Sequence, residues 1–308
     1  NNKNICGDFE ILERENSFIF LSSEMIKGLE NYCERNNNKE YITPPFSIRN
    51  LIKVQKHTNK DGKKVGQWFS NYDTIRLFTI ITKGMNENKD CDFKIINCNE
   101  GIIYVEDIIQ QCFEEYKNVE NSEEFEILRL NSSEDLEVIN NDIGDNKYAF
   151  DDKLYKFKDK FILFVSVRHG LYNLDEPIQN EVLKIFDIET NIGFIGGKNS
   201  RAFYFIGKCG KNVIFLDPHY VQSTIPLIQL GTISVKDSYI PNDIYYMPVE
   251  ELSPSFTIGF AVNNMQNFKK LMTRLNTSGW IYSSNLKNKE YTDYLFTVKS
   301  FHHEVKFK

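Results

Sequence analysis

The sequence predicts an α+β domain, in which helices come first along the chain and most of the strands follow. Two observations support this class: helix-spaced apolar residues lie in the early part of the chain, and short apolar runs of strand length predominate from residue 161 onward. This order is typical of layered α+β domains. Because 41% of the 308 residues are hydrophobic, the chain can bury a sizeable core, and we expect a single domain spanning residues 1–308.

The early part of the chain predicts helices separated by polar loops. Ser22-Ser23-Glu24 can cap a helix that continues to Tyr32. Pro44-Pro45 ends any helix, and a new one is expected to start near Phe46. The apolar positions from Ile75 to Ile81 indicate a further helix that packs against the core.

Two short strands, a helix and a polar segment are expected next. Phe93–Ile96 and Gly101–Val105 have the length and apolar content of strands. Glu106–Tyr116 has apolar residues at helical spacing. The following segment, 117–160, is acidic and rich in Asn, so we interpret it as an insertion with little core content.

The second half of the chain supplies most of the sheet. Phe161–Val167 is a continuous apolar run of strand length, as expected for a central strand that is buried on both faces. Phe256–Val262 indicates another strand. Helices are expected at Glu176–Phe186 and at Met265–Leu275, the second of which closes the domain.

Composition and charge exclude several classes of function. The formal net charge is -6 and no basic block occurs, so nucleic acid is not an expected partner. No CxxC pair or Cys/His cluster indicates zinc, and we expect neither a metal nor a cofactor. The six cysteines form no dense disulfide pattern, and unpaired thiols suggest a reducing compartment. No signal peptide opens the chain and no apolar run reaches roughly 18 residues, so a cytoplasmic protein is expected.

The residues with the clearest chemistry follow a predicted β-hairpin. Ala202–Gly207 and Asn212–Leu216 indicate two strands around Gly210. Asp217 and His219 leave the second strand together, and residues two apart in an extended segment point to the same side. A cysteine protease needs an imidazole that exchanges protons with the thiol and the leaving group, and a third group that orients this imidazole. The alternative is an Asp-Pro turn followed by a surface histidine, and the spacing alone does not decide between them.

Five blocks of sequence extend this pattern along the chain. The first runs from Gly196 to Gly207 and continues, after Gly210, to Ile214-Phe215-Leu216-Asp217-Pro218-His219. The other four are Pro45-Phe46-Ser47-Ile48, Gly66-Gln67-Trp68-Phe69, Arg168-His169-Gly170-Leu171 and Ser253-Pro254-Ser255-Phe256. Together, in their order along the chain, the blocks resemble those of the autophagins, which are papain-like cysteine proteases of autophagy.

The resemblance implies a papain-like α+β fold in which Asp217 and His219 are the acid and the imidazole of a catalytic triad. It also implies that the protein cleaves a ubiquitin-like modifier after its C-terminal glycine. The same enzyme would release the modifier from phosphatidylethanolamine. The expected partner is therefore this modifier, both as the free precursor and as the lipid-conjugated form, with transient access to a membrane surface.

The resemblance further implies a gate over the nucleophile. The matching residues are Trp68 and the loop Lys198, Asn199, Ser200 and Arg201, and Gly196-Gly197 would supply backbone freedom for its movement. Two positions depart from the family pattern: Asn199 replaces a proline, and Ser70-Asn71 replaces a Gly-Pro pair. For Trp68, ordinary core packing is the alternative.

The nucleophile is not identified. The family carries it in Gly-Trp-Gly-Cys at a helix N-terminus, and this motif is absent from the sequence. Cys6 is a poor candidate because Gly7 and Asp8 follow it, and Cys33 and Cys209 fit less well. We therefore expect either that the chain begins after the nucleophile, so that this N-terminal segment is missing, or that the protein is a non-catalytic module that binds the modifier.

Three further features complete the candidate residues. His169 has no acidic partner by spacing, so structural packing is expected for it. The segments around Phe9 and Phe125 each combine an acidic residue, an aromatic and an aliphatic three positions later. Such peptides can add a strand to the sheet of a modifier, and an ordinary amphipathic strand is the alternative.

Overall fold

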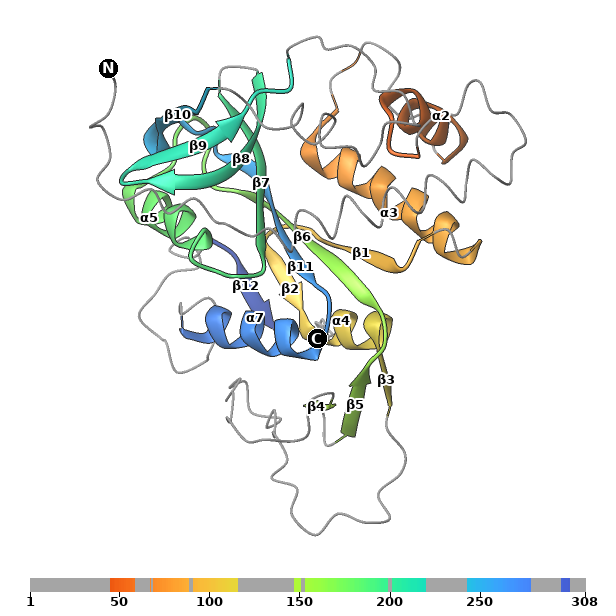
Figure 1. Ribbon diagram of the computed structural model, residues 1–308. Helices are drawn as coiled ribbons and strands as arrows, with labels where there is room; N and C mark the ends of the chain where they lie inside the picture. Colours follow the sequence, from red (N-terminus) through yellow and green to blue (C-terminus); the bar gives the residue numbers. More distant parts are fainter. Residues whose placement is uncertain are drawn as a thin grey trace, which may run out of the picture.

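The computed structural model describes residues 45–58, 67, 69–88, 91–115, 147–150, 153–198, 201–219, 243–277 and 295–299 (Figure 1). The helix expected from Ser22 to Tyr32 and the segments around Phe9 and Phe125 lie outside these residues. No helix in the described ranges is long and apolar enough to cross a membrane.

A seven-stranded sheet organises the domain, with the strand order β1-β6-β11-β7-β8-β9-β10. β1 and β6 run parallel, and every other neighbouring pair is antiparallel. The predicted strand at 161–167 is confirmed as β6, which has a neighbour on each side. The strands are β1 (Phe93–Cys98), β6 (Lys160–Arg168), β7 (Asn191–Lys198), β8 (Arg201–Cys209), β9 (Asn212–Leu216), β10 (Tyr245–Pro248) and β11 (Ser255–Val262).

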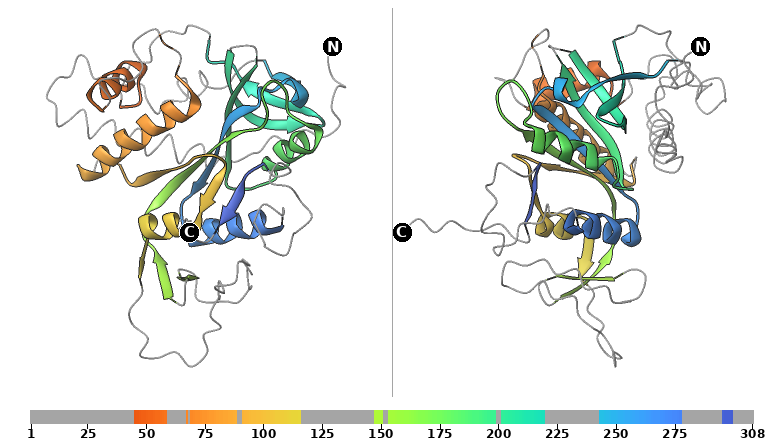
Figure 2. Two further views of the ribbon diagram at one scale, coloured as in Figure 1. Left: turned by 180° about the vertical axis from the view of Figure 1, so that it is seen from behind. Right: turned by 90° about the vertical axis from the view of Figure 1, so that its left-hand side faces the viewer.

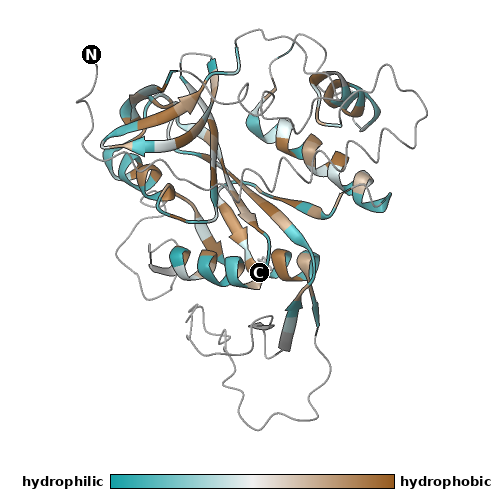
Figure 3. Ribbon diagram, viewed as in Figure 1, coloured by the Kyte–Doolittle hydropathy of each residue, from teal (hydrophilic) through white to brown (hydrophobic). Residues whose placement is uncertain are grey.

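Helices cover the two faces of this sheet unequally (Figures 1 and 2). On one face, a large core cluster includes Ile108, Val182 and Phe268 from three helices, packed with alternate residues of β6 such as Leu163. The other face carries a smaller cluster around Ile75. The strands are largely hydrophobic, whereas much of the surface of the helix at the lower end of the sheet is hydrophilic (Figure 3). The helices are α2 (Ile48–Thr58), α3 (Asn71–Glu87), α4 (Val105–Cys112), α5 (Glu176–Ile185), α7 (Met265–Thr277) and the short 3-10 helix η2 (Val249–Glu251).

A capping box fixes the start of α3 and its position on the sheet. The Ser70 hydroxyl accepts a hydrogen bond from the Asp73 backbone N–H at 3.1 Å, and the Ser70 N–H donates to the Asp73 carboxylate at 3.0 Å. The Asn71 amide then donates to the backbone oxygen of Ile195 in β7 at 3.2 Å. The Ser-Asn pair that departs from the family pattern therefore ties the start of α3 to the sheet.

Two small sheets complete the fold. In one, β12 (Thr297–Lys299) pairs in parallel with β2 (Ile102–Tyr104), which joins the far end of the described chain to its first third. In the other, β3 (Phe113–Glu115), β5 (Lys153–Phe157) and β4 (Lys147–Phe150) form an antiparallel sheet.

The helix expected at 106–116 ends earlier than predicted, at Cys112. The reason is that Phe113–Glu115 pairs with β5 as a strand instead of continuing the helix. Phe157, near the end of the 117–160 segment, packs against Phe113 and Phe161 with ring centroids at 5.4 and 6.4 Å. The last part of this segment thus contributes to the core, contrary to the expectation of little core content.

The predicted hairpin at 202–216 is confirmed as β8 and β9, but the strand before it was missed. Gly196-Gly197 was expected to loosen the backbone, and this expectation is wrong because both residues lie inside β7 and pair with β8. A Cβ atom at Gly197 would lie 2.3 Å from the backbone oxygen of Arg201. Glycine is required here by close backbone approach within a sheet, not by mobility.

Candidate active site

The Asp217-Pro218-His219 segment lies directly after β9, where the last strand residue, Leu216, pairs with Tyr204 of β8. Asp217 is the first residue past the strand, and Pro218 and His219 form a turn. The side chains therefore meet because the chain turns, and not because an extended strand continues. The two readings of the sequence are compatible, since the Asp-Pro turn is the device that brings the carboxylate and the imidazole together.

Two hydrogen bonds join His219 to the Asp217 carboxylate, one from the imidazole ring and one from the backbone. The His219 Nδ1 atom lies 2.5 Å from Asp217 Oδ1, and the His219 backbone N–H donates to the same oxygen at 2.9 Å. With Nδ1–H donating to the carboxylate, the proton-accepting lone pair of neutral His219 is on Nε2. The ring also contacts Phe203 edge-on, with centroids 6.0 Å apart. His219 is thus held as an oriented base with half of its side chain, 51%, exposed.

The charge of Asp217 is preserved by its surroundings. Burial raises the pKa of this carboxyl, but the opposing contributions are larger in sum: hydrogen bonds from the backbone and side chain of His219, and the charges of His219 and Arg201. The net effect lowers the pKa below its ordinary value of 3.8. Asp217 is therefore an anion at neutral pH and stabilises a positive charge on the imidazole.

Only two of the five predicted gating residues lie in the described part of the chain. Lys198 and Arg201 face each other at the end of the β7–β8 ladder, whereas Trp68, Asn199 and Ser200 lie outside it. Lys198 forms an ion pair with Glu251 of η2. The neighbouring Ser253 N–H donates to the backbone oxygen of Gly197 at 2.8 Å. The base of the predicted gate is therefore anchored to the segment after β10.

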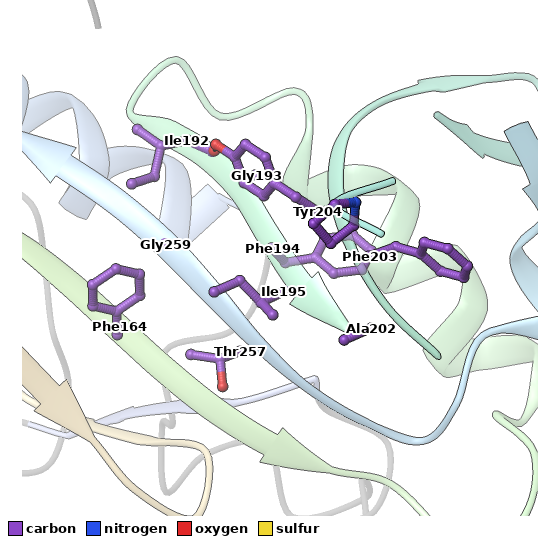
Figure 4. Close-up of a pocket in the computed structure, with 11 residues that line it drawn as sticks. Phe164, Ile192, Gly193, Phe194, Ile195, Ala202, Phe203, Tyr204, Thr257 and Gly259 are labelled. Carbon is purple, nitrogen blue, oxygen red and sulfur yellow. The ribbon is translucent and has the colours of Figure 1, made fainter. Parts of the chain in front are cut away.

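An apolar cavity of about 350 Å³ opens on the sheet face next to this segment (Figure 4). Pro218 contributes to its lining, so the cavity and the Asp217–His219 pair share a boundary. The Tyr204 hydroxyl donates to the backbone oxygen of Ile192, and burial raises the pKa of Tyr204 to about 12. Strands β6, β11, β7 and β8 supply the remaining lining residues, which are Phe164, Ile192, Gly193, Phe194, Ile195, Ala202, Phe203, Tyr204, Thr257 and Gly259.

The described cysteines supply no activated nucleophile to His219. Burial raises the pKa of both Cys98 and Cys112 to about 12, so these thiols stay protonated. Cys209 is disulfide-bonded, which shows that the expectation of unpaired thiols is wrong for this residue. Cys91 is half-buried just before β1, five strands from β9 in the sheet, or about 24 Å at the usual strand spacing. Cys6 and Cys33 lie outside the described residues.

His169 has the structural role that the sequence suggested. Its Nε2 atom lies 2.6 Å from the backbone oxygen of Leu295, and its backbone N–H donates to the oxygen of Pro254 at 2.8 Å. These contacts hold the end of β6 against the segments before β11 and β12. Within the described ranges, no group of three or more His, Cys, Asp or Glu side chains could hold a metal ion.

Sequence reasoning missed Glu251 and Phe203. Glu251 follows Lys198 by 53 residues, and no local pattern connects the two. Phe203 appeared only as one apolar residue of a strand, yet its ring packs on both Phe215 and His219. The alternation of side chains along β8 was the one available signal for the position of Phe203.

Comparison with known proteins finds cysteine proteases that are similar in sequence. The chain is 25% identical to the probable cysteine protease ATG4 of Debaryomyces hansenii over 234 residues, which cover 75% of this chain and 38% of that protein. It is 26% identical to human cysteine protease ATG4C over 232 residues, covering 73% of this chain and 41% of the relative. The chain thus spans less than half the length of these two relatives.

A family model described as the Peptidase C54 catalytic domain matches residues 21–274. The match confirms the resemblance to the autophagins. With the mixed helices and sheets of the structure, it also confirms the predicted papain-like α+β class. The chain belongs to the Peptidase C54 family.

Proposed function

We propose that the protein is a cysteine protease of the autophagy pathway that cleaves a ubiquitin-like modifier after its C-terminal glycine and releases it from phosphatidylethanolamine. The observation that carries this proposal is the His219 imidazole held by the ionised Asp217 carboxylate at 2.5 Å. The family match and the names of the relatives support the reaction class.

His219 would act first as a base and then as an acid. Its Nε2 takes the proton of the nucleophilic thiol, and the thiolate attacks the glycine carbonyl carbon. The imidazolium, stabilised by Asp217, then gives this proton to the leaving nitrogen as the C–N bond breaks, which leaves a thioester. Water, deprotonated by His219, attacks the thioester, and the thiol is regenerated with a free glycine carboxylate.

The same steps serve both substrates. In the precursor the leaving nitrogen is a peptide amine, and in the lipid conjugate it is the ethanolamine amine of the headgroup. Both bonds are amides of the same glycine carboxyl group, so one acid at Nε2 protonates either leaving group. The proposal therefore needs no second catalytic centre.

The nucleophile must come from outside the residues described, at hydrogen-bond distance from His219 Nε2. The cavity beside Pro218 is a suitable seat for the element that carries it, because it is apolar and adjoins the imidazole. Helix α3 packs mainly on β1, and Asn71 at its start donates to the backbone oxygen of Ile195, which lines this cavity. Trp68 and the loop from Lys198 to Arg201 would border the groove that admits a narrow glycine tail.

The test is trimming of a C-terminally extended ubiquitin-like modifier, followed by intact-mass spectrometry. His219→Ala should abolish trimming, whereas His57→Ala, an exposed histidine at the end of α2, should leave it unchanged. Iodoacetamide protection by the modifier would locate the nucleophilic cysteine. Wild-type trimming by His219→Ala would contradict the proposal.

A second function, a module that binds the modifier without cutting it, is favoured by one observation. Cys98 and Cys112 are buried and Cys209 is disulfide-bonded, so the described chain places no reactive thiol at His219. Binding of the modifier without any loss of its C-terminal extension would support this function. In either case we propose a cytoplasmic site of action, which cell fractionation with an antibody to the protein would test.

A further inference from the structure

The outer face of α7 forms one wall of a second cavity, of about 370 Å³. Its helical residues follow each other at intervals of three and four, so their side chains lie on one face. The opposite wall is the connection between α5 and β7, and its floor includes the buried Ile188 and Leu271. The polar and charged lining residues are Glu189, Thr190, Gln266, Lys269, Lys270, Thr273 and Arg274.

Positive charge dominates this cavity. Among the residues that the structure describes, Lys269, Lys270 and Arg274 line this cavity together with the carboxylate of Glu189, which pairs with Lys270 at 2.6 Å. Lys269 is half-buried and forms no ion pair within the part of the chain that the structure describes. This concentration of cations contrasts with the net charge of -6 of the whole chain. A concave site with excess positive charge attracts anions.

The floor of the cavity also holds an unsatisfied hydroxyl. Thr190 is 2% exposed, and its Oγ1 has no hydrogen-bond partner among the described residues. A buried polar group without a partner is uncommon, but this oxygen is covered, so Thr190 shapes the floor and does not donate to the cavity. Thr273 and Gln266 supply the neutral donors at the rim.

The cavity is separate from the Asp217–His219 pair. Thr190 immediately precedes β7, whereas Leu216, the residue before Asp217, pairs with Tyr204, which in turn pairs with Ile195 of β7. Ile195 is five residues along the chain from Thr190, about 16 Å at the usual rise per residue. Figure 1 shows α7 at the end of the sheet opposite to the tip where β7 meets β8.

From these observations we propose that the α7 cavity binds a phosphate monoester. Three cations with hydroxyl and amide donors match the charge and the acceptor oxygens of such a group. The cavity volume leaves room for the rest of a headgroup-sized molecule. The phosphate could belong to an anionic lipid or to a soluble compound, and the chemistry of recognition is the same in both.

Two probes distinguish the sources, both tested with the full chain. Calorimetry with soluble inositol 1,4-bisphosphate measures the free phosphate, and sedimentation with phosphatidylcholine vesicles that contain phosphatidylinositol 4-phosphate measures the lipid. Binding of both probes would mean that the phosphate monoester alone is sufficient for binding, without a lipid surface. Binding of vesicles alone assigns the lipid source. Binding of neither probe overturns the proposal.

Variants localise the binding. The double change Lys269→Ala and Arg274→Ala should weaken it at least about tenfold, because charge-assisted hydrogen bonds are lost. Glu189→Gln should strengthen it about two- to fivefold by removing the negative charge that Glu189 contributes to the cavity. The matched control Lys53→Ala and Lys56→Ala removes two cations from α2 and should bind as the wild type does.

Two results with these variants would contradict the proposal. Equal binding by the wild type and the Lys269/Arg274 double variant would overturn it. An equal loss in the α2 control would overturn it as well, because the attraction would then be general. Unchanged far-UV circular dichroism and melting temperature show that the double variant is folded, which removes misfolding as a cause of lost binding.

Discussion

Replacing Asp217 by Asn tests the proposed role of the carboxylate most directly. Asparagine keeps the shape of the side chain but removes the charge that accepts both the ring and the backbone hydrogen bonds of His219. A hydrogen bond to a charged group contributes about 1.5–3 kcal/mol. If that stabilisation acts mainly on the imidazolium of the transition state, kcat/KM should fall about 10- to 150-fold.

The size of this effect follows from the exposure of the pair. Half of the His219 side chain is exposed, so water screens part of the interaction, and we expect a smaller loss than in a buried triad, where about 10⁴-fold is known for the equivalent change. The assay is the rate of modifier trimming at saturating and at limiting substrate. Equal kcat/KM for Asp217→Asn and the wild type would refute the reasoning.

Nitrogen-15 NMR of the imidazole supplies an independent readout that does not need a nucleophile. The wild type should show the proton of neutral His219 on Nδ1, because this atom faces the carboxylate at 2.5 Å. Asp217→Asn should lose this preference, since the amide can also donate. A wild-type His219 that carries its proton on Nε2 would contradict the assigned orientation.

The pH dependence of stability tests the same pair. The pKa of Asp217 is lowered in the folded state, so its contribution to stability is fully present above the unfolded value and is lost as the pH falls through the folded value. Urea unfolding should therefore show a stability difference between the wild type and Asp217→Asn at neutral pH that shrinks below pH 3.8. A difference that grows with acidity would contradict this sign.

Two further predictions concern the backbone near the site. Glu251→Gln removes the ion pair with Lys198, so amide hydrogen exchange at the end of β7 should become faster, while the free energy of unfolding changes by less than about 1 kcal/mol. Glu250→Gln is the control. Equal exchange rates in the two variants would refute the anchoring role of the ion pair. Gly197→Ala places a Cβ 2.3 Å from a backbone oxygen and should destabilise the folded protein by about 1–3 kcal/mol in urea unfolding. Gly84→Ala, which has open space around it in α3, should stabilise the folded protein by up to about 1 kcal/mol. An unchanged stability of Gly197→Ala would show that the strand can shift to accommodate the methyl group.

The elements that the sequence predicts well are those with unbroken local patterns. Phe161–Val167 and Asn212–Leu216 are apolar runs bounded by polar residues, and both are strands in the structure. Asn191–Lys198 was missed because its three glycines resemble a loop. Those glycines are explained by close contacts with β8 and, at Gly196, also with Phe256 and Leu252, and no local window of sequence can reveal these contacts.

In the candidate site, too, local contacts could be predicted from the sequence and long-range contacts could not. Asp217 and His219 are two residues apart, so their pairing is local and was predicted. The Lys198–Glu251 ion pair and the packing of Phe203 on His219 depend on how distant strands are brought together. The motif therefore identified the Asp217–His219 pair, whereas the contacts that support this pair depend on the tertiary structure.

The pairing of β2 with β12 has a consequence for how the protein is made. Ile102 meets Thr297, about 195 residues later in the chain, and Val298 is fully buried at this junction. At a synthesis rate of about 5–20 residues per second, about 10–40 s pass between the synthesis of β2 and the synthesis of its partner strand β12. The nascent protein thus spends that interval with an incomplete core edge, during which chaperones can bind it.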